Sequence, residues 1–168
     1  MLHCYGDSRF VKQDQNKEEG LFQKLGCTDG YIENGLQTQG LIPHLPGKTG
    51  SHKSLTAVLS IGGNDIMTCD TLNCVDSAIH RFEKVVSTLG NSYGKVLVVG
   101  PPPDNGLVSL PLSTESIYNM VNNKIDSYSN VLLLPLHNMT ELAWLNDNIH
   151  FDDKSNTLLS RYIKDSIS

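Results

Sequence analysis

The chain has 168 residues, of which 39% are hydrophobic and 18% are charged, and its formal net charge is −5. This composition excludes a disordered, collagen-like or low-complexity chain, and the length predicts a single domain over residues 1–168. The negative charge argues against nucleic acid or an anionic membrane as a partner, because both bind basic surfaces. No apolar run reaches the roughly 18 residues that a membrane span needs.

Short apolar segments alternate along the chain with longer segments of helical period. This alternation is typical of an α/β fold built on a parallel sheet. Five segments have the character of strands, and the last three are almost continuously apolar, as in strands covered on both faces. These segments are residues 2–5, 31–32, 55–61, 95–99 and 131–136.

Three longer helices are predicted from apolar residues that recur in steps of three and four. The apolar pattern of the first helix runs from Leu72 to Leu89, and we expect Gly90 to end this helix. The second has Ser113 or Thr114 as a candidate cap, and the third occupies the C-terminus. A shorter helix is expected within residues 17–25.

Residues 35–54 have a different character, because glycine and proline recur throughout the segment and exclude one continuous helix. We expect a loop with at most a short helix, lying over one end of the sheet. Loops of this length inside a compact domain are often functional. Its two histidines, His44 and His52, are expected to be solvated.

The four cysteines form no CxxC pair, and their spacing fits neither a zinc knuckle nor a thioredoxin motif. We expect buried or half-buried free thiols, because a domain of this length does not need a disulfide, although one remains an alternative. The N-terminus has no signal-peptide pattern. The chain is therefore expected to be cytoplasmic if it is complete, and secreted or virion-associated if it is a trimmed domain.

Three polar clusters lie where strands should end. Residues 6–8 (Gly-Asp-Ser) follow the first predicted strand, and residues 62–65 (Gly-Gly-Asn-Asp) follow the third. Residues 147–150 (Asp-Asn-Ile-His) come just before the last predicted helix. The carboxyl ends of parallel strands share one edge of a sheet, and ligand sites lie there. Residues from all three clusters can therefore meet in space.

The residue types in these clusters favour acyl-transfer chemistry. The Ser8 hydroxyl is inert near neutral pH without a base, and the His150 imidazole has the pKa range of such a base. The Asp147 carboxylate can accept the second N–H of that imidazole and fix its tautomer. The Asn64 amide and backbone N–H groups can donate hydrogen bonds to a developing oxyanion.

Taken together, these motifs resemble the SGNH (GDSL-like) hydrolase family. The Gly-Asp-Ser of residues 6–8 matches the first block, and Asn34-Gly35 is the candidate for the second. Residues 62–65 match the Gly-x-Asn-Asp block, and Asp147 with His150 matches the Asp-x-x-His block. The resemblance extends from residue 6 to residue 150 in the order of the family. It departs at Arg9, where the GDSL pattern has leucine.

The resemblance implies a flavodoxin-like three-layer α/β/α sandwich with a five-stranded parallel sheet. It also implies that Ser8 is the nucleophile, His150 the base and Asp147 the residue that orients it, with no metal or cofactor. The oxyanion hole would consist of the Ser8 amide, the Gly35 amide and the Asn64 side chain.

The expected activity is that of a serine carboxylester hydrolase, which releases small acyl groups such as acetyl from a small-molecule or carbohydrate ester. A lysophospholipase or thioesterase of the same family is one alternative, and a non-catalytic module of a viral or surface assembly is another. Arg9 and Trp144 are candidate pocket residues, with surface and packing roles as alternatives. Asp7 and Asp65 are expected to be structural, and the oligomeric state is left open.

Overall fold

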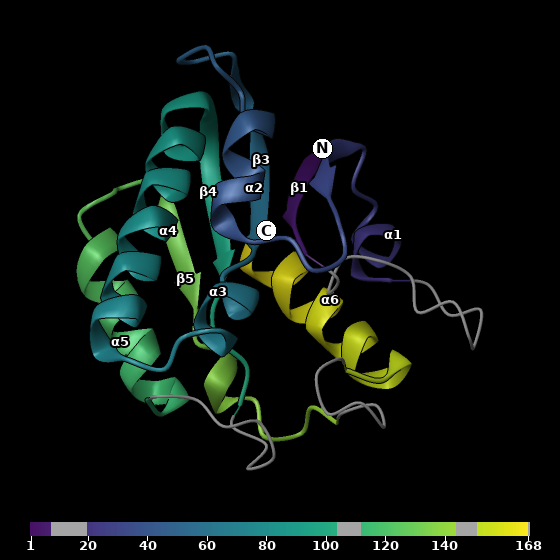
Figure 1. Ribbon diagram of the computed structural model, residues 1–168. Coiled ribbons are helices and arrows are strands. Elements are labelled where there is room, and N and C mark those ends of the chain that lie inside the picture. Colours follow the sequence, from purple (N-terminus) through teal and green to yellow (C-terminus); the bar gives the residue numbers. More distant parts are fainter. Residues whose placement is uncertain (8–19, 104–111, 144–150, 168) are drawn as a thin grey trace.

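The computed structural model describes residues 1–7, 20–103, 112–143 and 151–167. Five parallel strands form one sheet in the order β2-β1-β3-β4-β5, which confirms the predicted five-stranded parallel sheet (Figure 1). The order is the flavodoxin-like one, and it reverses between β1 and β3. The strands are β1 (Leu2–Gly6), β2 (Asp29–Ile32), β3 (His52–Ser60), β4 (Tyr93–Val99) and β5 (Val131–Leu134).

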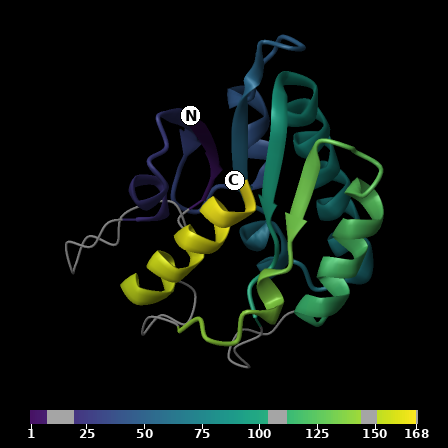
Figure 2. The same ribbon diagram turned by 180° about the vertical axis from the view of Figure 1, so that it is seen from behind.

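Helices cover both faces of this sheet, and the three-layer sandwich is confirmed (Figures 1 and 2). Alternate residues of each central strand point to opposite faces, so Ala57 and Leu59 belong to one core and Val58 to the other. The first core lies under α2 (Thr38–Leu41), α3 (Gly63–Met67), α4 (Leu72–Ser92) and α5 (Thr114–Ile125). The second lies under α1 (Leu21–Leu25) and α6 (Asp153–Ile167).

The helix signals in the sequence are mostly confirmed. Ser113 caps α5 by accepting a hydrogen bond from the Ser116 amide at 3.2 Å. Gly90, however, does not end α4, which continues to Ser92. A helical glycine costs only about 1 kcal/mol relative to alanine, and the buried face of α4 outweighs that cost. No helix of the described ranges is both long and apolar enough to cross a bilayer.

Residues 35–54 contain more regular structure than the sequence predicts. The short helix α2 is followed by a 3₁₀ helix, η2 (Ile42–His44), and β3 begins as early as His52. His52 is therefore not a solvated loop residue, because its ring stacks on Tyr93 at 4.8 Å between centroids. His44 is exposed, as expected, and stacks on Tyr31.

The expectation of free thiols is wrong. Cys4 is bonded to Cys27 and Cys69 to Cys74, which leaves no free cysteine. The first bridge ties β1 to the segment between α1 and β2, and the second closes the connection between α3 and α4. Sequence spacing alone does not show which cysteines approach each other, because the pairing depends on how the chain folds around them.

A buried polar cluster joins β1 to β4 on the face that α4 covers. The Tyr93 hydroxyl lies 2.7 Å from His3 Nδ1 and 2.7 Å from the Tyr5 hydroxyl. Burial is the main cause that lowers the pKa of His3, the neighbouring His52 lowers it further, and Asp29 partly opposes both. Burial likewise raises the pKa of Tyr93. The cluster is therefore stable in its neutral form.

Candidate active site at the carboxyl edge of the sheet

The first cluster begins at the point where the strand order reverses. β1 ends at Gly6 and β3 ends at Ser60, and the Asp7 amide donates to the Ser60 carbonyl at 3.1 Å. Asp7 is buried. Gly6 and Asp7 therefore lie at the carboxyl edge between β1 and β3, which is where open α/β sheets bind ligands.

Five of the predicted site residues lie outside the described residues: Ser8, Arg9, Trp144, Asp147 and His150. Their roles remain predictions from the sequence. The structure does describe the residues that adjoin these segments in the sequence. It also describes the two remaining predicted site residues, Gly35 and Asn64.

Gly35 lies in a turn directly after β2. The turn is anchored by the Glu33 amide, which donates to the Gly6 carbonyl at 3.1 Å. Gly35 has a φ of +74°, a left-handed conformation that side chains with a Cβ rarely adopt. Gly35, the residue predicted from the sequence, therefore lies in a turn that is tied to the end of β1, and its conformation favours glycine.

Asn64 lies in the first turn of α3, which begins directly after β3. Gly62 precedes that helix with a φ of +108°, so the chain turns sharply from the strand end into the helix. The Asn64 Nδ2 donates to the Leu36 carbonyl at 3.1 Å, next to Gly35. An amide nitrogen carries two N–H donors, so this bond orients the side chain while a second N–H can serve a ligand.

Asp65, the next residue, joins α3 to the start of α2 through buried hydrogen bonds. Its side chain is 3% exposed and accepts from the Thr38 amide at 3.1 Å and from the Thr38 hydroxyl at 2.8 Å. Arg81 Nη2 lies 3.8 Å from the same carboxylate. A structural role for Asp65 was expected, but the partner Thr38 has no signal in the sequence because nothing in the spacing links residue 38 to residue 65.

The described residues on either side of segment 144–150 lie together at the start of α6. The Asp152 amide donates to the Ala143 carbonyl at 3.0 Å, and the Ala143 amide donates to Ser155 Oγ at 2.7 Å. Asp153 forms a 2.7 Å ion pair with Lys24 of α1. The described residues that flank the Asp-x-x-His block in the sequence are thus held together at one place.

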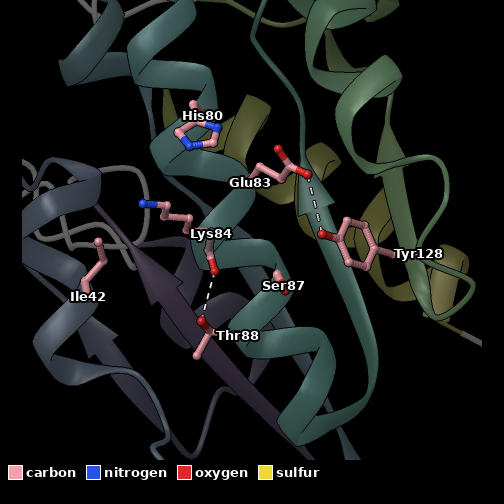
Figure 3. A pocket seen from close by; sticks show the side chains of 7 residues that line it. All are labelled: Ile42, His80, Glu83, Lys84, Ser87, Thr88 and Tyr128. Carbon is pink, nitrogen blue, oxygen red and sulfur yellow. Dashed lines mark hydrogen bonds between the residues drawn. The ribbon is translucent and has the colours of Figure 1, made fainter.

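A groove of about 450 Å³ on the outer surface of α4 is separate from these residues (Figure 3). Glu83 and Tyr128 lie across from each other in it, joined by a 3.5 Å hydrogen bond. Of the predicted site residues that the structure describes, neither Gly35 nor Asn64 lines this groove. Its lining residues are Ile42, His80, Glu83, Lys84, Ser87, Thr88 and Tyr128.

The Asn64 side chain and the Gly35 turn thus lie near each other at the carboxyl edge of the sheet. The Leu36 carbonyl joins the Asn64 amide to the Gly35 turn, and Glu33 joins that turn to the end of β1. Such an arrangement can bind an anion, or an oxygen atom on which negative charge develops.

No family model and no curated protein matches the sequence. Solved structures do match it over almost the whole chain. A lipase/acylhydrolase from Enterococcus faecalis has a TM-score of 0.73 at 16% identity, covering 99% of this chain and 94% of that one. A member of the lipolytic G-D-S-L family from Veillonella parvula has a TM-score of 0.68 at 15% identity, with 98% and 96% covered.

An acetylxylan esterase from Geobacillus stearothermophilus has a TM-score of 0.65 at 15% identity, with 99% and 93% covered. That esterase has also been solved as a catalytic mutant in which alanine replaces a serine. At these identities the likeness concerns the fold. The chain has the SGNH-like hydrolase fold, and its Gly-Asp-Ser and Gly-x-Asn-Asp motifs begin where β1 and β3 end.

Proposed function

We propose that the protein is a serine carboxylester hydrolase whose nucleophile is Ser8. The observation that carries the proposal is the hydrogen bond from the Asn64 side chain to Leu36, which joins Asn64 to the Gly35 turn after β2. Structural neighbours described as an acylhydrolase and an acetylxylan esterase support the same reaction class.

In the proposed reaction, Ser8 Oγ attacks the ester carbonyl while His150 takes the hydroxyl proton. Asp147 stabilises the imidazolium that forms, and the carbonyl oxygen becomes an oxyanion. The Ser8 and Gly35 amides and the Asn64 side chain donate to that oxyanion. His150 then gives its proton to the departing alcohol. Water, deprotonated by the same imidazole, releases the acid and restores Ser8.

We propose acetyl as the acyl group and a carbohydrate or other small molecule as the alcohol. At the carboxyl edge the described residues contribute short elements, namely the start of α2 and the helix α3, and the acetylxylan esterase neighbour acts on an acetylated carbohydrate by its description. The acylhydrolase neighbour favours a second candidate, a lysophospholipase or thioesterase that takes longer acyl chains.

A labelled fluorophosphonate tests the nucleophile directly, because it phosphonylates an activated serine. Wild-type protein should be labelled and Ser8→Ala should not, and Ser8→Ala should abolish ester turnover without changing the melting temperature. A folded wild-type protein that resists the label would identify a non-catalytic module. Turnover by Ser8→Ala would contradict the mechanism.

A series of p-nitrophenyl esters tests the acyl group. We expect kcat/KM to be highest for the acetyl ester and to fall as the chain lengthens. A kcat/KM that rises from the acetyl ester toward the C8 ester would support the lysophospholipase or thioesterase instead. Acetylated xylo-oligosaccharides, assayed by acetate release, then test the carbohydrate part of the proposal.

The two disulfides favour the secreted or virion-associated alternative for the location of the protein, because structural disulfides persist in oxidising compartments. Alkylation of denatured, unreduced protein followed by mass spectrometry checks this. Protein from its native source should contain no alkylated cysteine. Four alkylated cysteines would favour the cytoplasm.

A further inference from the structure

We propose that Asp65 is a positioning residue that holds the two oxyanion donors, Gly35 and Asn64, at a fixed separation. The inference depends on the proposed function, since it assigns a role within that site. Asp65 would not touch the substrate. It would act through the segment of chain that connects the Gly35 turn to α2.

The first observation is where the carboxylate is bound. α2 begins at Thr38, and the preceding Gln37 side chain makes no capping hydrogen bond. Instead, Asp65 accepts from both the amide and the hydroxyl of Thr38. The Asp65 carboxylate therefore supplies from another helix the acceptor that a cap residue would supply locally.

The second observation is that the Gly35 turn is held from both sides. On the side of β2, the Glu33 amide bonds to Gly6. On the side of α2, Thr38 bonds to Asp65, which is adjacent to Asn64 in the chain. Between these anchors the Leu36 carbonyl accepts from the Asn64 side chain. Loss of the Thr38 anchor would release one side of this turn.

The third observation is that Asp65 is itself well fixed. Thr38 is fully buried and Asp65 is 4% exposed, so the two hydrogen bonds lie in a low-dielectric environment, where they are strong. Arg81 from α4 lies beside the carboxylate and partly offsets its charge. The Thr68 hydroxyl donates to the Asp65 carbonyl at 2.9 Å, and the Cys69–Cys74 bridge closes the segment that follows.

The physical consequence concerns rate rather than affinity. An oxyanion hole stabilises the transition state only if its donors are already placed when the charge develops. A displacement of about 1 Å can cost on the order of 10²-fold in rate. A fixed Gly35–Asn64 separation therefore raises kcat, whereas ground-state binding of the ester depends much less on it.

The test compares Asp65→Asn in α3 with Asp70→Asn, which changes an exposed carboxylate on the connection between α3 and α4, using p-nitrophenyl acetate. We expect Asp65→Asn to lower kcat about 10- to 100-fold and to leave KM nearly unchanged. This loss is smaller than the 10²–10³-fold loss that is typical when a whole oxyanion donor is removed. Asp70→Asn should match wild type. Wild-type kcat in folded Asp65→Asn protein would overturn the proposal.

A double-mutant cycle separates positioning from general stability. If Asp65 acts through Asn64, then Asp65→Asn should have a much smaller effect on kcat in an Asn64→Ala background than in wild type. An equal factor in both backgrounds would overturn the proposal. For variants whose ester turnover is too slow to measure, the rate of labelling by the fluorophosphonate replaces kcat in this comparison.

If Asp65→Asn does not fold, Thr38→Val is the second variant, because it removes the hydroxyl but keeps the backbone amide. It should lower kcat by a smaller factor, and Thr38→Ser should restore it; wild-type kcat in Thr38→Val would then overturn the inference. Labelling of wild type at Ser8 separates the two proposals. Labelled wild type with an unaffected Asp65→Asn variant contradicts only the positioning role, whereas unlabelled wild type contradicts both.

Discussion

Two buried polar clusters lie under the same layer of helices, and they differ in construction. At the carboxyl edge, Asp65 and Thr38 join two short helices through a carboxylate. Nearer the amino ends of the strands, Tyr93 joins His3 and Tyr5 through hydroxyl and imidazole groups. The first connects segments that adjoin the candidate site, whereas the second connects strands of the sheet itself.

This difference predicts a division of roles. A cluster between strands is formed when the sheet forms, so its loss should reduce the stability of the whole fold. A cluster between short helices at the edge holds loops whose geometry matters for chemistry. We therefore expect changes at the carboxyl edge to affect rate and changes in the Tyr93 cluster to affect stability.

The largest effect is expected for Asn64→Ala. Loss of one oxyanion donor typically lowers kcat by about 10²–10³-fold. The Asn64 side chain is only partly buried, so the melting temperature should change little. Ester kinetics and thermal unfolding on the same preparation check both parts. A large loss of stability with normal kcat would place Asn64 with the structural residues.

The disulfides should differ in their contribution to stability. Because Cys4 and Cys27 are 23 residues apart, loop-closure entropy predicts about 3.5 kcal/mol for their bridge, against about 2 kcal/mol for the separation of five residues between Cys69 and Cys74. Denaturant unfolding of Cys4→Ala/Cys27→Ala and of Cys69→Ala/Cys74→Ala checks the order. The reverse order would show that native contacts outweigh chain entropy.

Tyr93→Phe should lower the free energy of unfolding by about 1–3 kcal/mol, because it leaves buried groups of His3 and Tyr5 without their shared partner. The kcat of the folded protein should stay the same. Tyr31→Phe is the matched control, since it removes only an exposed hydrogen bond to Glu33. Equal losses in the two variants would show that burial of the cluster is unimportant.

The smallest effect is a pH dependence of stability through His3. Its pKa is lowered in the folded protein, so below about pH 6.5 the unfolded chain binds more protons than the folded one. The contribution of His3 is therefore complete above that pH and is lost as the pH falls toward the lowered pKa. Urea unfolding between pH 5 and 8 should show that the free energy of unfolding depends less steeply on pH in His3→Gln than in wild type. An equal slope in the two proteins would contradict this role of His3.

The sequence was most informative about features that depend on neighbouring residues along the chain. Continuous apolar runs predicted the central strands, the strand ends placed Gly6 and Asn64 at one edge, and the family resemblance added Gly35. The signals were weaker for contacts between distant segments. Nothing in the sequence links Cys4 with Cys27, Thr38 with Asp65, or His3 with Tyr93, because each pair depends on how separate elements pack.

Pattern and composition by themselves determined the class of fold and the positions of the candidate motifs, since periodicity and strand-end glycines are local properties of the chain. Only the tertiary structure decided the cysteine pairing, the early start of β3 at His52 and the continuation of α4 through Gly90. These features follow from packing free energy summed over many distant contacts, which can outweigh the preference of any single residue.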